Sequence, residues 1–500
     1  MTDGEVAAAL LSDAGTVVVE AAAGTGKTHR AAEAAVACAS TLTGGREVLL
    51  LAHTNAAIDE FRQRLGNHHA VRYETLDSFA LSLVKAHPAA SGLTTPIVPD
   101  YTPRSGWFPG LTVAAAALLQ HAPGVARQVA LHHPFVLLDE HQDARPSQHL
   151  IAECLRDAGA RIRILGDPMQ AIFEFDGDSV VDWESVKNGA DLVAPLSTPH
   201  RWTGAPALGE WLVAARDALA RCDPLPRAHA PASVGFHCMT GVGNAYPRGR
   251  RSGPGLGVTL GPLLRSLRGQ VGILVPYRDS AFGVRGAIGR RVGIYEGHDV
   301  PIAHESADAA AAASGNAERM IEVAIALAEA TCTGVTTKVR TDAEACFPGG
   351  RFDMGRRRVV PPLVELLKPL ALEPTVRQVG RFAAGLRANP PDDIKVDLRE
   401  SLDAMAHVGA RDDGDQHTAI VDYMRRRRIA SPAGQSQILT IHKAKGRAFD
   451  HVIIVHCSAG PFPDTEAGCR LLYVAITRAR QSVHLLASDT HPSPLLRLAG

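Results

Sequence analysis

Hydrophobic and polar positions follow one recurring pattern along this chain. Short apolar runs, typical of buried strands, lead into polar or small residues and then into segments with helical spacing. The runs lie at residues 17–19, 47–52, 135–138, 162–165, 271–276, 437–441, 452–455 and 483–486. Strands that end in polar residues and continue into helices predict an α/β protein with parallel sheets, whose carboxyl ends carry the ligand groups.

The pattern changes in the second half of the chain. Residues 221–270 are rich in loop-forming residues, and residues 303–430 are mostly helical in pattern. Helices are predicted at 317–331, 361–371, 375–387 and 415–428. The strand pattern then returns, so we expect a second α/β domain that a helical segment interrupts. The predicted division is a first domain at 1–195 with a small insertion at about 80–130, a second domain at 196–290 and 433–500, and a helical insertion at 291–432.

Overall charge gives no indication of a nucleic-acid partner, because 52 basic side chains balance 52 acidic ones. Any such binding must therefore come from local basic surface. No apolar run reaches the ~18–20 residues of a membrane span, and the N-terminus is acidic. The eight cysteines include no Cys-x-x-Cys pair, which argues against a zinc or iron–sulfur site. We expect a cytoplasmic protein with reduced thiols and no membrane partner.

The strongest chemical signal follows the first apolar run. Residues 21–28 read Ala21-Ala22-Ala23-Gly24-Thr25-Gly26-Lys27-Thr28, between a strand and an Ala-rich helix. Backbone N–H groups of such a loop can surround phosphate oxygens. Lys27 would reach the β- and γ-phosphates, and the Thr28 hydroxyl would hold Mg²⁺. An Ala/Gly-rich turn is the alternative, but Gly-x-Gly-Lys-Thr after a strand favours a phosphate loop.

Two adjacent carboxylates form the second signal. Asp139 and Glu140 follow the apolar residues 135–138. An acid at a strand end opposite a phosphate loop is suited to hold Mg²⁺, and its neighbour can orient and deprotonate water. The alternative of a solvated loop is less favoured, because the chain also carries the phosphate loop.

Eight segments in a fixed order resemble the motifs of superfamily 1 helicases of the UvrD/Rep/PcrA type. They are residues 21–28, 51–57, 75–79, 139–143, 166–173, 199–201, 440–446 and 472–479. The resemblance implies two RecA-like P-loop NTPase domains with a small 1B insertion and a mostly helical 2B-like insertion. It also implies an ATP-dependent enzyme that uses Mg²⁺ and translocates on single-stranded DNA with 3′-to-5′ polarity.

The resemblance assigns roles to matching residues. Gln170 would sense the γ-phosphate, and Arg201 and Arg478 would reach it from the second domain. An inserted guanidinium stabilises charge on a transferring phosphoryl group. On the DNA side, aromatic rings stack on bases while polar groups line the strand path. The residues expected to contact DNA are His53, Thr54, Asn55, Ser78, Phe173, Phe175, Thr440 and His442. Core packing is the equal alternative for Phe173, and the arginine runs 356–358 and 425–428 are either solvated faces or duplex contacts.

The chain departs from the family pattern at some positions. Residues 1–16 contain no Gln that could read adenine, and Ala448 replaces the acid expected at the ribose. We therefore keep two functions: a helicase acting at single/double-strand junctions in repair, recombination or phage defence, and an NTP-hydrolysing, DNA-responsive switch that regulates a partner nuclease. The compact length resembles the helicase-like subunit of Gabija-like defence systems. A silent scaffold and a small-molecule kinase fit the motif set less well.

Overall fold

The computed structural model describes residues 1–500 except 67, 94–96, 98–105, 174–179, 240–253, 289–291, 296–299, 356–359, 412–415, 429–435 and 497–500. The chain forms two compact units. Unit 1 comprises Met1–Pro99, Gly106–Val292 and Ser436–Gly500, and unit 2 comprises Asp100–Ser105 and Gly293–Gln435. Unit 1 contains two parallel-sheet α/β regions, which confirms the expected fold class. The domain boundaries expected from the sequence remain predictions.

The first sheet of unit 1 has the strand order β3-β2-β4-β5-β1-β6, with every neighbouring pair parallel. Its strands are β1 (Thr16–Ala21), β2 (Val48–Ala52), β3 (Val71–Thr75), β4 (Phe135–Asp139), β5 (Arg161–Gly166) and β6 (Leu192–Leu196). Ala52 pairs with Asp139, and Glu20 pairs with Gly166. The register therefore brings the polar ends of β1, β4 and β5 to one edge of the sheet.

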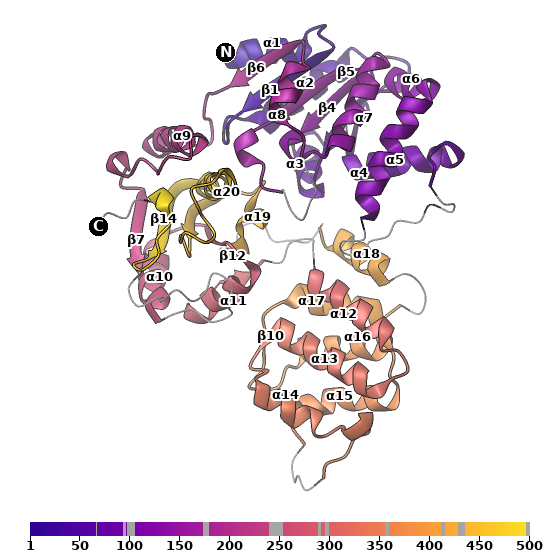
Figure 1. Ribbon diagram of the computed structural model, residues 1–500, viewed down its shortest axis with the longest axis vertical. Helices are drawn as coiled ribbons and strands as arrows, with labels where there is room; N and C mark the ends of the chain where they lie inside the picture. Colours follow the sequence, from indigo (N-terminus) through magenta and orange to yellow (C-terminus); the bar gives the residue numbers. More distant parts are fainter. Residues whose placement is uncertain are drawn as a thin grey trace. The chain divides into compact units, whose positions relative to one another are not determined.

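Helices cover both faces of this sheet (Figure 1). They are α1 (Asp3–Leu11), α2 (Lys27–Ser40), α3 (Asn55–Leu65), α4 (Leu76–Ala86), α5 (Trp107–His121), α6 (Pro123–His132), α7 (Pro146–Asp157) and α8 (Trp183–Asn188), with short 3₁₀ turns η1 (Pro88–Ala90), η2 (His141–Asp143) and η3 (Pro168–Gln170). Side chains alternate along each strand. Val18 therefore joins the core under α4, α5 and α7, and Val17 and Val19 join the core under α1 and α2.

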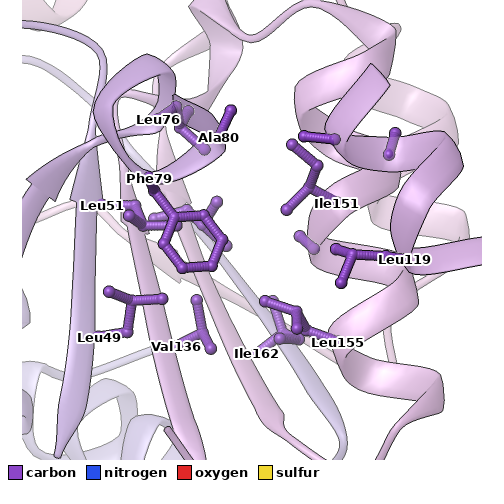
Figure 2. Packing of buried hydrophobic residues seen from close by; sticks show 14 of the residues in the cluster. Leu49, Leu51, Leu76, Phe79, Ala80, Leu119, Val136, Ile151, Leu155 and Ile162 are labelled. Carbon is purple, nitrogen blue, oxygen red and sulfur yellow. The ribbon is translucent and has the colours of Figure 1, made fainter. Parts of the chain in front are cut away.

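The core under α4, α5 and α7 is built from strand and helix side chains of distant parts of the chain. Figure 2 shows the Phe79 ring between the strand residues Leu51 and Val136 and the helix side that carries Ile151 and Leu155. All of these residues are at most 4% exposed. This packing fixes α4 and α7 against the strands whose carboxyl ends carry the site residues.

The second sheet of unit 1 contains β7, β14, β13, β8 and β12 in that order, with these neighbours parallel. Its strands are β7 (Val234–Met239), β8 (Val271–Val275), β12 (Gln437–Thr440), β13 (Phe449–Ile454) and β14 (Ala479–Ser488). The accompanying helices are α9 (Pro206–Ala220), α10 (Pro254–Ser266), α11 (Arg278–Ala287), α19 (Ile441–Ala444) and α20 (Glu466–Ile476), with 3₁₀ turns η4 (Arg227–His229) and η6 (Pro494–Leu496).

Two elements of this region lie where the sequence predicted mainly loop. β7 pairs with β14 over its whole length, and Val234 and Met239 are buried. α10 forms despite its glycines because Leu256 and Leu260, four residues apart, are fully buried on one helix face. Tertiary packing therefore overrides the weak local propensity of residues 254–266.

Unit 2 is mostly helical, as the sequence predicted for residues 303–430. Its elements are β9 (Gly293–Ile294), α12 (Pro301–Ala312), α13 (Ala317–Thr331), β10 (Cys332–Thr333), α14 (Thr337–Glu344), η5 (Pro348–Gly350), α15 (Pro362–Leu372), α16 (Val376–Ala388), β11 (Lys395–Val396), α17 (Arg399–Gly409) and α18 (Gln416–Arg428). The four predicted helices correspond to α13, α15, α16 and α18. Among the described residues, no helix has the length and apolar character that spanning a bilayer requires.

Candidate active site

The phosphate loop links the end of β1 to the start of α2. Gly24 and Gly26 have φ angles of +78° and +83°, a region that favours glycine. The Gly24 carbonyl accepts hydrogen bonds from the N–H groups of His200 and Arg201, at 2.8 and 3.0 Å. A Cβ at Gly24 would lie 2.8 Å from the Trp202 ring, so this position also needs glycine sterically.

The remaining loop residues stabilise the same turn. Ala21 is the last residue of β1 and is buried. The Thr25 N–H and hydroxyl both donate to the Ala22 carbonyl, at 3.3 and 2.7 Å. The Ala23 N–H donates to the Tyr473 hydroxyl at 3.0 Å. The loop therefore has a defined backbone shape and contacts the segment that follows β13.

Lys27 faces the two carboxylates that end β4. Its Nζ atom lies 2.8 Å from Glu140 Oε1 and 3.7 Å from Asp139 Oδ1. Burial disfavours the charged amine, but Glu140 and Asp139 outweigh it and raise the pKa of Lys27. Burial also acts to raise the pKa of Glu140, yet Lys27 and Lys445 hold it below its usual range. Lys27 and Glu140 are therefore a charged pair at neutral pH.

Thr28 and Asp139 are the residues predicted to hold Mg²⁺, and their side chains lie next to each other. The Thr28 hydroxyl donates to Asp139 Oδ2 at 3.4 Å. Hydroxyl and carboxylate oxygens are ligands that Mg²⁺ prefers. Burial raises the pKa of Asp139 to about 6 against the attraction of Lys27. The Thr28 hydroxyl and the buried Asp139 carboxylate therefore fit an Mg²⁺ site, at which the ion would neutralise phosphate charge when bound.

Glu140 is held in position by its backbone and by Gln142. Its φ angle is +55°, which is uncommon for a residue with a side chain. Gln142 Nε2 donates to Glu140 Oε2 at 2.6 Å, and Gln142 Oε1 accepts the Asp167 N–H at 3.0 Å. Gln142 therefore joins the end of β4 to the end of β5.

Asp167 is a fully buried carboxylate that several side chains approach. Gln170 Nε2 donates to its Oδ2 atom at 2.8 Å, and the Tyr473 hydroxyl donates to the same atom at 3.3 Å. Arg216 Nη2 lies 3.4 Å from Oδ1 and 3.7 Å from Glu20 Oε1. A buried carboxylate surrounded by donors stabilises a fixed geometry of the groups that contact it.

The two predicted arginines converge on Thr477. Arg201 Nη1 donates to the Thr477 carbonyl at 2.7 Å, and Arg478 Nη2 donates to the Thr477 hydroxyl at 2.9 Å. Arg478 Nη2 also donates to Gln170 Oε1 at 3.0 Å. Burial lowers the pKa of Arg201 to about 9, with a contribution from the nearby Arg478 charge. Two cations thus lie side by side, and Arg478 contacts the side chain expected to sense the γ-phosphate.

The residues predicted to contact DNA from the first sheet lie at the starts of two helices. Thr54 caps α3 by accepting the Ala57 N–H, and its side chain is exposed. Ser78 lies in the first turn of α4 and accepts a hydrogen bond from Thr75 Oγ1 at 2.8 Å. His53 is mostly buried, and burial lowers its pKa to about 3. His53 therefore is a neutral imidazole, whereas Thr54 remains accessible.

From the second sheet, Thr440 and His442 lie at the start of α19. Thr440 caps that helix by accepting the Lys443 N–H. The His442 ring lies 6.2 Å from the Phe173 ring, measured between centroids. Lys445 Nζ lies 5.0 Å from the Phe173 centroid and forms an ion pair with Asp143. Phe173 is thus half-buried beside a cation and an imidazole, and its contact with a DNA base stays a prediction.

Some predicted residues lie outside the described part of the chain. Phe175 and the arginine run 356–358 fall in undescribed segments, and the side chains of Asn55 and of residues 425–428 are not described. The roles of the described site residues also stay predictions, although their positions are now given.

Sequence reasoning missed three contributors to this network. Tyr473 lies within a recognised motif, so its position inside that motif was an available signal. Asp167 likewise follows a predicted strand. Arg216 lies on α9 without any motif, and only the fold brings it within 3.4 Å of Asp167.

Within the part of the chain that the structure describes, a group of potential metal ligands also lies away from the phosphate loop. One ligand atom each of Glu47, His132 and His133 lies within 4.8 Å of the others. Glu47 directly precedes β2, whereas Asp139 is opposite the other end of that strand. The cluster is therefore separate from the residues that fit Mg²⁺.

Comparisons with known proteins match two segments of this chain. Residues 436–486 match the family described as UvrD-like helicase C-terminal domain, and residues 5–176 match the AAA domain family. DNA helicase IV of Escherichia coli (strain K12) is similar, with 35% identity over 89 residues. That alignment covers 13% of this chain and 13% of that protein, so the similarity extends over a small part of either.

Proposed function

We propose, from the premise that the chain is a UvrD/Rep-type superfamily 1 helicase, that it hydrolyses ATP with Mg²⁺ and moves along single-stranded DNA. The observation that carries this proposal is the contact of Arg478 with Gln170, at 3.0 Å. Gln170 follows a strand of the first sheet, and Arg478 precedes a strand of the second. Phosphoryl transfer next to Gln170 and Arg478 would require side chains from both sheets. ATP turnover would therefore depend on how the two sheets are placed relative to each other.

Each side chain has a chemical task in this reaction. Lys27 and the loop N–H groups would bind the phosphates, and Thr28 and Asp139 would hold Mg²⁺. A phosphate that attracts Lys27 would weaken the ion pair with Glu140, which could then accept a proton from the attacking water. Arg201 and Arg478 would stabilise the charge that spreads over the transferring phosphoryl oxygens.

The finer parts of the function rest on the family resemblance. We propose 3′-to-5′ polarity, duplex unwinding at single/double-strand junctions, and a role in repair, recombination or phage defence in the cytoplasm. The exposed Thr54 hydroxyl and the half-buried Phe173 ring support contact with a single strand, because translocases combine polar contacts with stacking.

A second function is an NTP-driven switch that responds to DNA and regulates a partner nuclease without unwinding. Ala448, which stands where an acid would contact the ribose, favours it. A strand-displacement assay on a 3′-tailed duplex separates the two functions. The helicase proposal expects displaced strand that depends on ATP, whereas the switch expects DNA-stimulated hydrolysis with no displaced strand.

The primary test is ATP hydrolysis by Lys27→Ala and Glu140→Gln in the full chain, with no polymer, single-stranded DNA, duplex DNA and RNA. We expect Lys27→Ala to lose DNA-stimulated turnover, because the phosphates lose their cation. Glu140→Gln should still bind ATP but turn over at least about a hundredfold more slowly, because water activation is lost.

Lys368→Ala is the matched control. Its amine pairs with Glu365 on α15 in unit 2, so it should keep wild-type turnover. Wild-type hydrolysis by Lys27→Ala would refute the proposal.

A further inference from the structure

The Tyr473 hydroxyl joins the phosphate loop to Asp167. It accepts the Ala23 N–H at 3.0 Å and donates to Asp167 Oδ2 at 3.3 Å. The side chain is 2% exposed, and burial raises the pKa of the phenol, so the hydroxyl keeps its proton. One oxygen atom is therefore both acceptor and donor between a loop N–H and a buried carboxylate.

Further hydrogen bonds connect Asp167 to Arg478 through the Gln170 side chain. Asp167 Oδ2 also accepts from Gln170 Nε2 at 2.8 Å, and Gln170 Oε1 accepts from Arg478 Nη2 at 3.0 Å. Tyr473 lies in α20, and Arg478 follows that helix within two residues. The hydrogen bonds therefore form a closed ring that starts and ends on the segment 473–478.

Further contacts of Arg216 and Thr477 hold the members of this closed ring of hydrogen bonds in place. Arg216 Nη2 approaches Asp167 Oδ1 at 3.4 Å, so both carboxylate oxygens have donors. The Thr477 hydroxyl donates to the Tyr473 carbonyl at 2.8 Å and to the Val474 carbonyl at 3.0 Å, which fixes the end of α20. A displacement of the loop at Ala23 must therefore move Tyr473, distort Asp167, or break a buried hydrogen bond, which is costly.

We propose that Tyr473 is a positioning residue that couples the state of the phosphate loop to the placement of Gln170 and Arg478. It touches no reacting atom, and it acts through its hydroxyl alone. This inference rests on the proposed ATP hydrolysis and adds a residue through which the loop and the second sheet would communicate.

The test is Tyr473→Phe in the full chain, which removes one oxygen atom and keeps the ring. We expect kcat of ATP hydrolysis with single-stranded DNA to fall about tenfold, the loss that corresponds to one buried hydrogen bond. KM for ATP should stay within about twofold, because the loop N–H groups and Lys27 that would bind phosphate are intact. Tyr73→Phe, on the edge strand β3, is the control and should match the wild type.

A double-variant cycle separates coupling from general loss of packing. Asp167→Asn should also lower kcat, and adding Tyr473→Phe to it should cause little further loss, because both substitutions break the same ring. Full additivity, an unchanged kcat for Tyr473→Phe, or a raised KM with unchanged kcat would overturn the inference. ATP hydrolysis by the wild-type protein, measured in parallel, shows whether a negative result concerns Tyr473 alone or the proposed function. If it hydrolyses no ATP with DNA, the proposed function fails and this inference with it, whereas an active wild type confines the failure to Tyr473.

Discussion

At the scale of single residues, Arg163 is a buried cation whose partners are backbone carbonyls. It is fully buried in β5, and its guanidinium donates to the carbonyls of Leu10, Ser12, Ala14 and Ile162 at 2.6 to 3.0 Å. Burial lowers its pKa to about 10, which leaves it charged at neutral pH. The last carbonyls of a helix have no hydrogen-bond partner within the helix. Arg163 donates hydrogen bonds to carbonyls at the end of α1 and so attaches this helix to the sheet.

We expect Arg163→Met to lower the free energy of unfolding by about 3 kcal/mol or more, because buried carbonyls lose their donors. Urea unfolding measures this loss. Arg161→Met on the same strand is the control. Arg161 is 39% exposed and pairs with Asp13, so its loss should cost less than about 1 kcal/mol. Equal losses in the two variants would contradict this role of Arg163.

His442 predicts a dependence of stability on pH. Burial, together with the Lys445 charge, lowers its pKa to about 4 from an ordinary value of 6.5. Between pH 6.5 and pH 4 the unfolded chain therefore binds a proton at this residue that the folded chain does not. The contribution of His442 to stability is complete above about pH 6.5 and falls as the pH is lowered through this window.

We expect the free energy of unfolding of His442→Gln to fall less than that of the wild type between pH 7 and pH 5, in urea titrations at each pH. The quantity compared is the difference in the free energy of unfolding between the variant and the wild type. Burial raises the pKa of Asp143 to about 6, so Asp143 makes both proteins more stable as the pH falls, and the difference removes this effect. His121→Gln, at the exposed end of α5, is the control and should keep the wild-type slope. Parallel slopes for His442→Gln and the wild type would contradict the prediction.

At the scale of elements, two glycines allow α16 and α17 of unit 2 to approach closely. A Cβ built at Gly380 would lie 2.5 Å from the Gly409 Cα atom. Backbone cannot move aside as a flexible side chain can, so any larger residue at Gly380 must separate the helices.

We therefore expect Gly380→Ala to destabilise the chain by about 1–3 kcal/mol in urea unfolding, although alanine favours a helix by about 1 kcal/mol. Gly286→Ala on α11 is the control, because a Cβ there meets nothing within 4 Å. It should be neutral or stabilising. A Gly380→Ala variant as stable as Gly286→Ala would show that the helices do not depend on this contact.

The elements that the sequence predicted best are those with long apolar runs. β1, β4 and β5 follow directly from such runs, and α13 spans the predicted 317–331. β3 was not predicted, because in this edge strand only the end residues Val71 and Thr75 are buried and the three residues between them are half-buried. β7 and α10 were missed for a related reason: packing against distant residues, which local pattern does not contain, stabilises both.

The site could be predicted only where a motif carried it. Lys27, Asp139 and Glu140 follow from strand ends and loop chemistry, and in the structure the Lys27 amine lies 3.7 Å or less from an oxygen of each carboxylate. Arg216 could not be predicted, because no local pattern links it to Asp167, 49 residues away in the chain. Contacts that depend on the register of two sheets become visible only in the folded chain.

At the scale of the whole molecule, residues of the two sheets of unit 1 contact one another. Tyr473, Arg478 and Lys445 follow or precede strands of the second sheet, and each contacts a residue at the carboxyl end of the first. Residues that follow or precede strands of the second sheet therefore belong to the same contact network as residues of the first sheet.

Single-stranded-DNA-stimulated ATP hydrolysis by Arg478→Ala, compared with Arg480→Ala, tests this claim most directly. Arg478 contacts Gln170, whereas Arg480, two residues further on, is 52% exposed. We expect kcat of Arg478→Ala to fall at least about a thousandfold, as for the loss of an arginine that stabilises a transferring phosphoryl group. Arg480→Ala should keep the wild-type rate. Wild-type turnover by Arg478→Ala, or equal losses in both variants, would contradict a site shared by the two sheets.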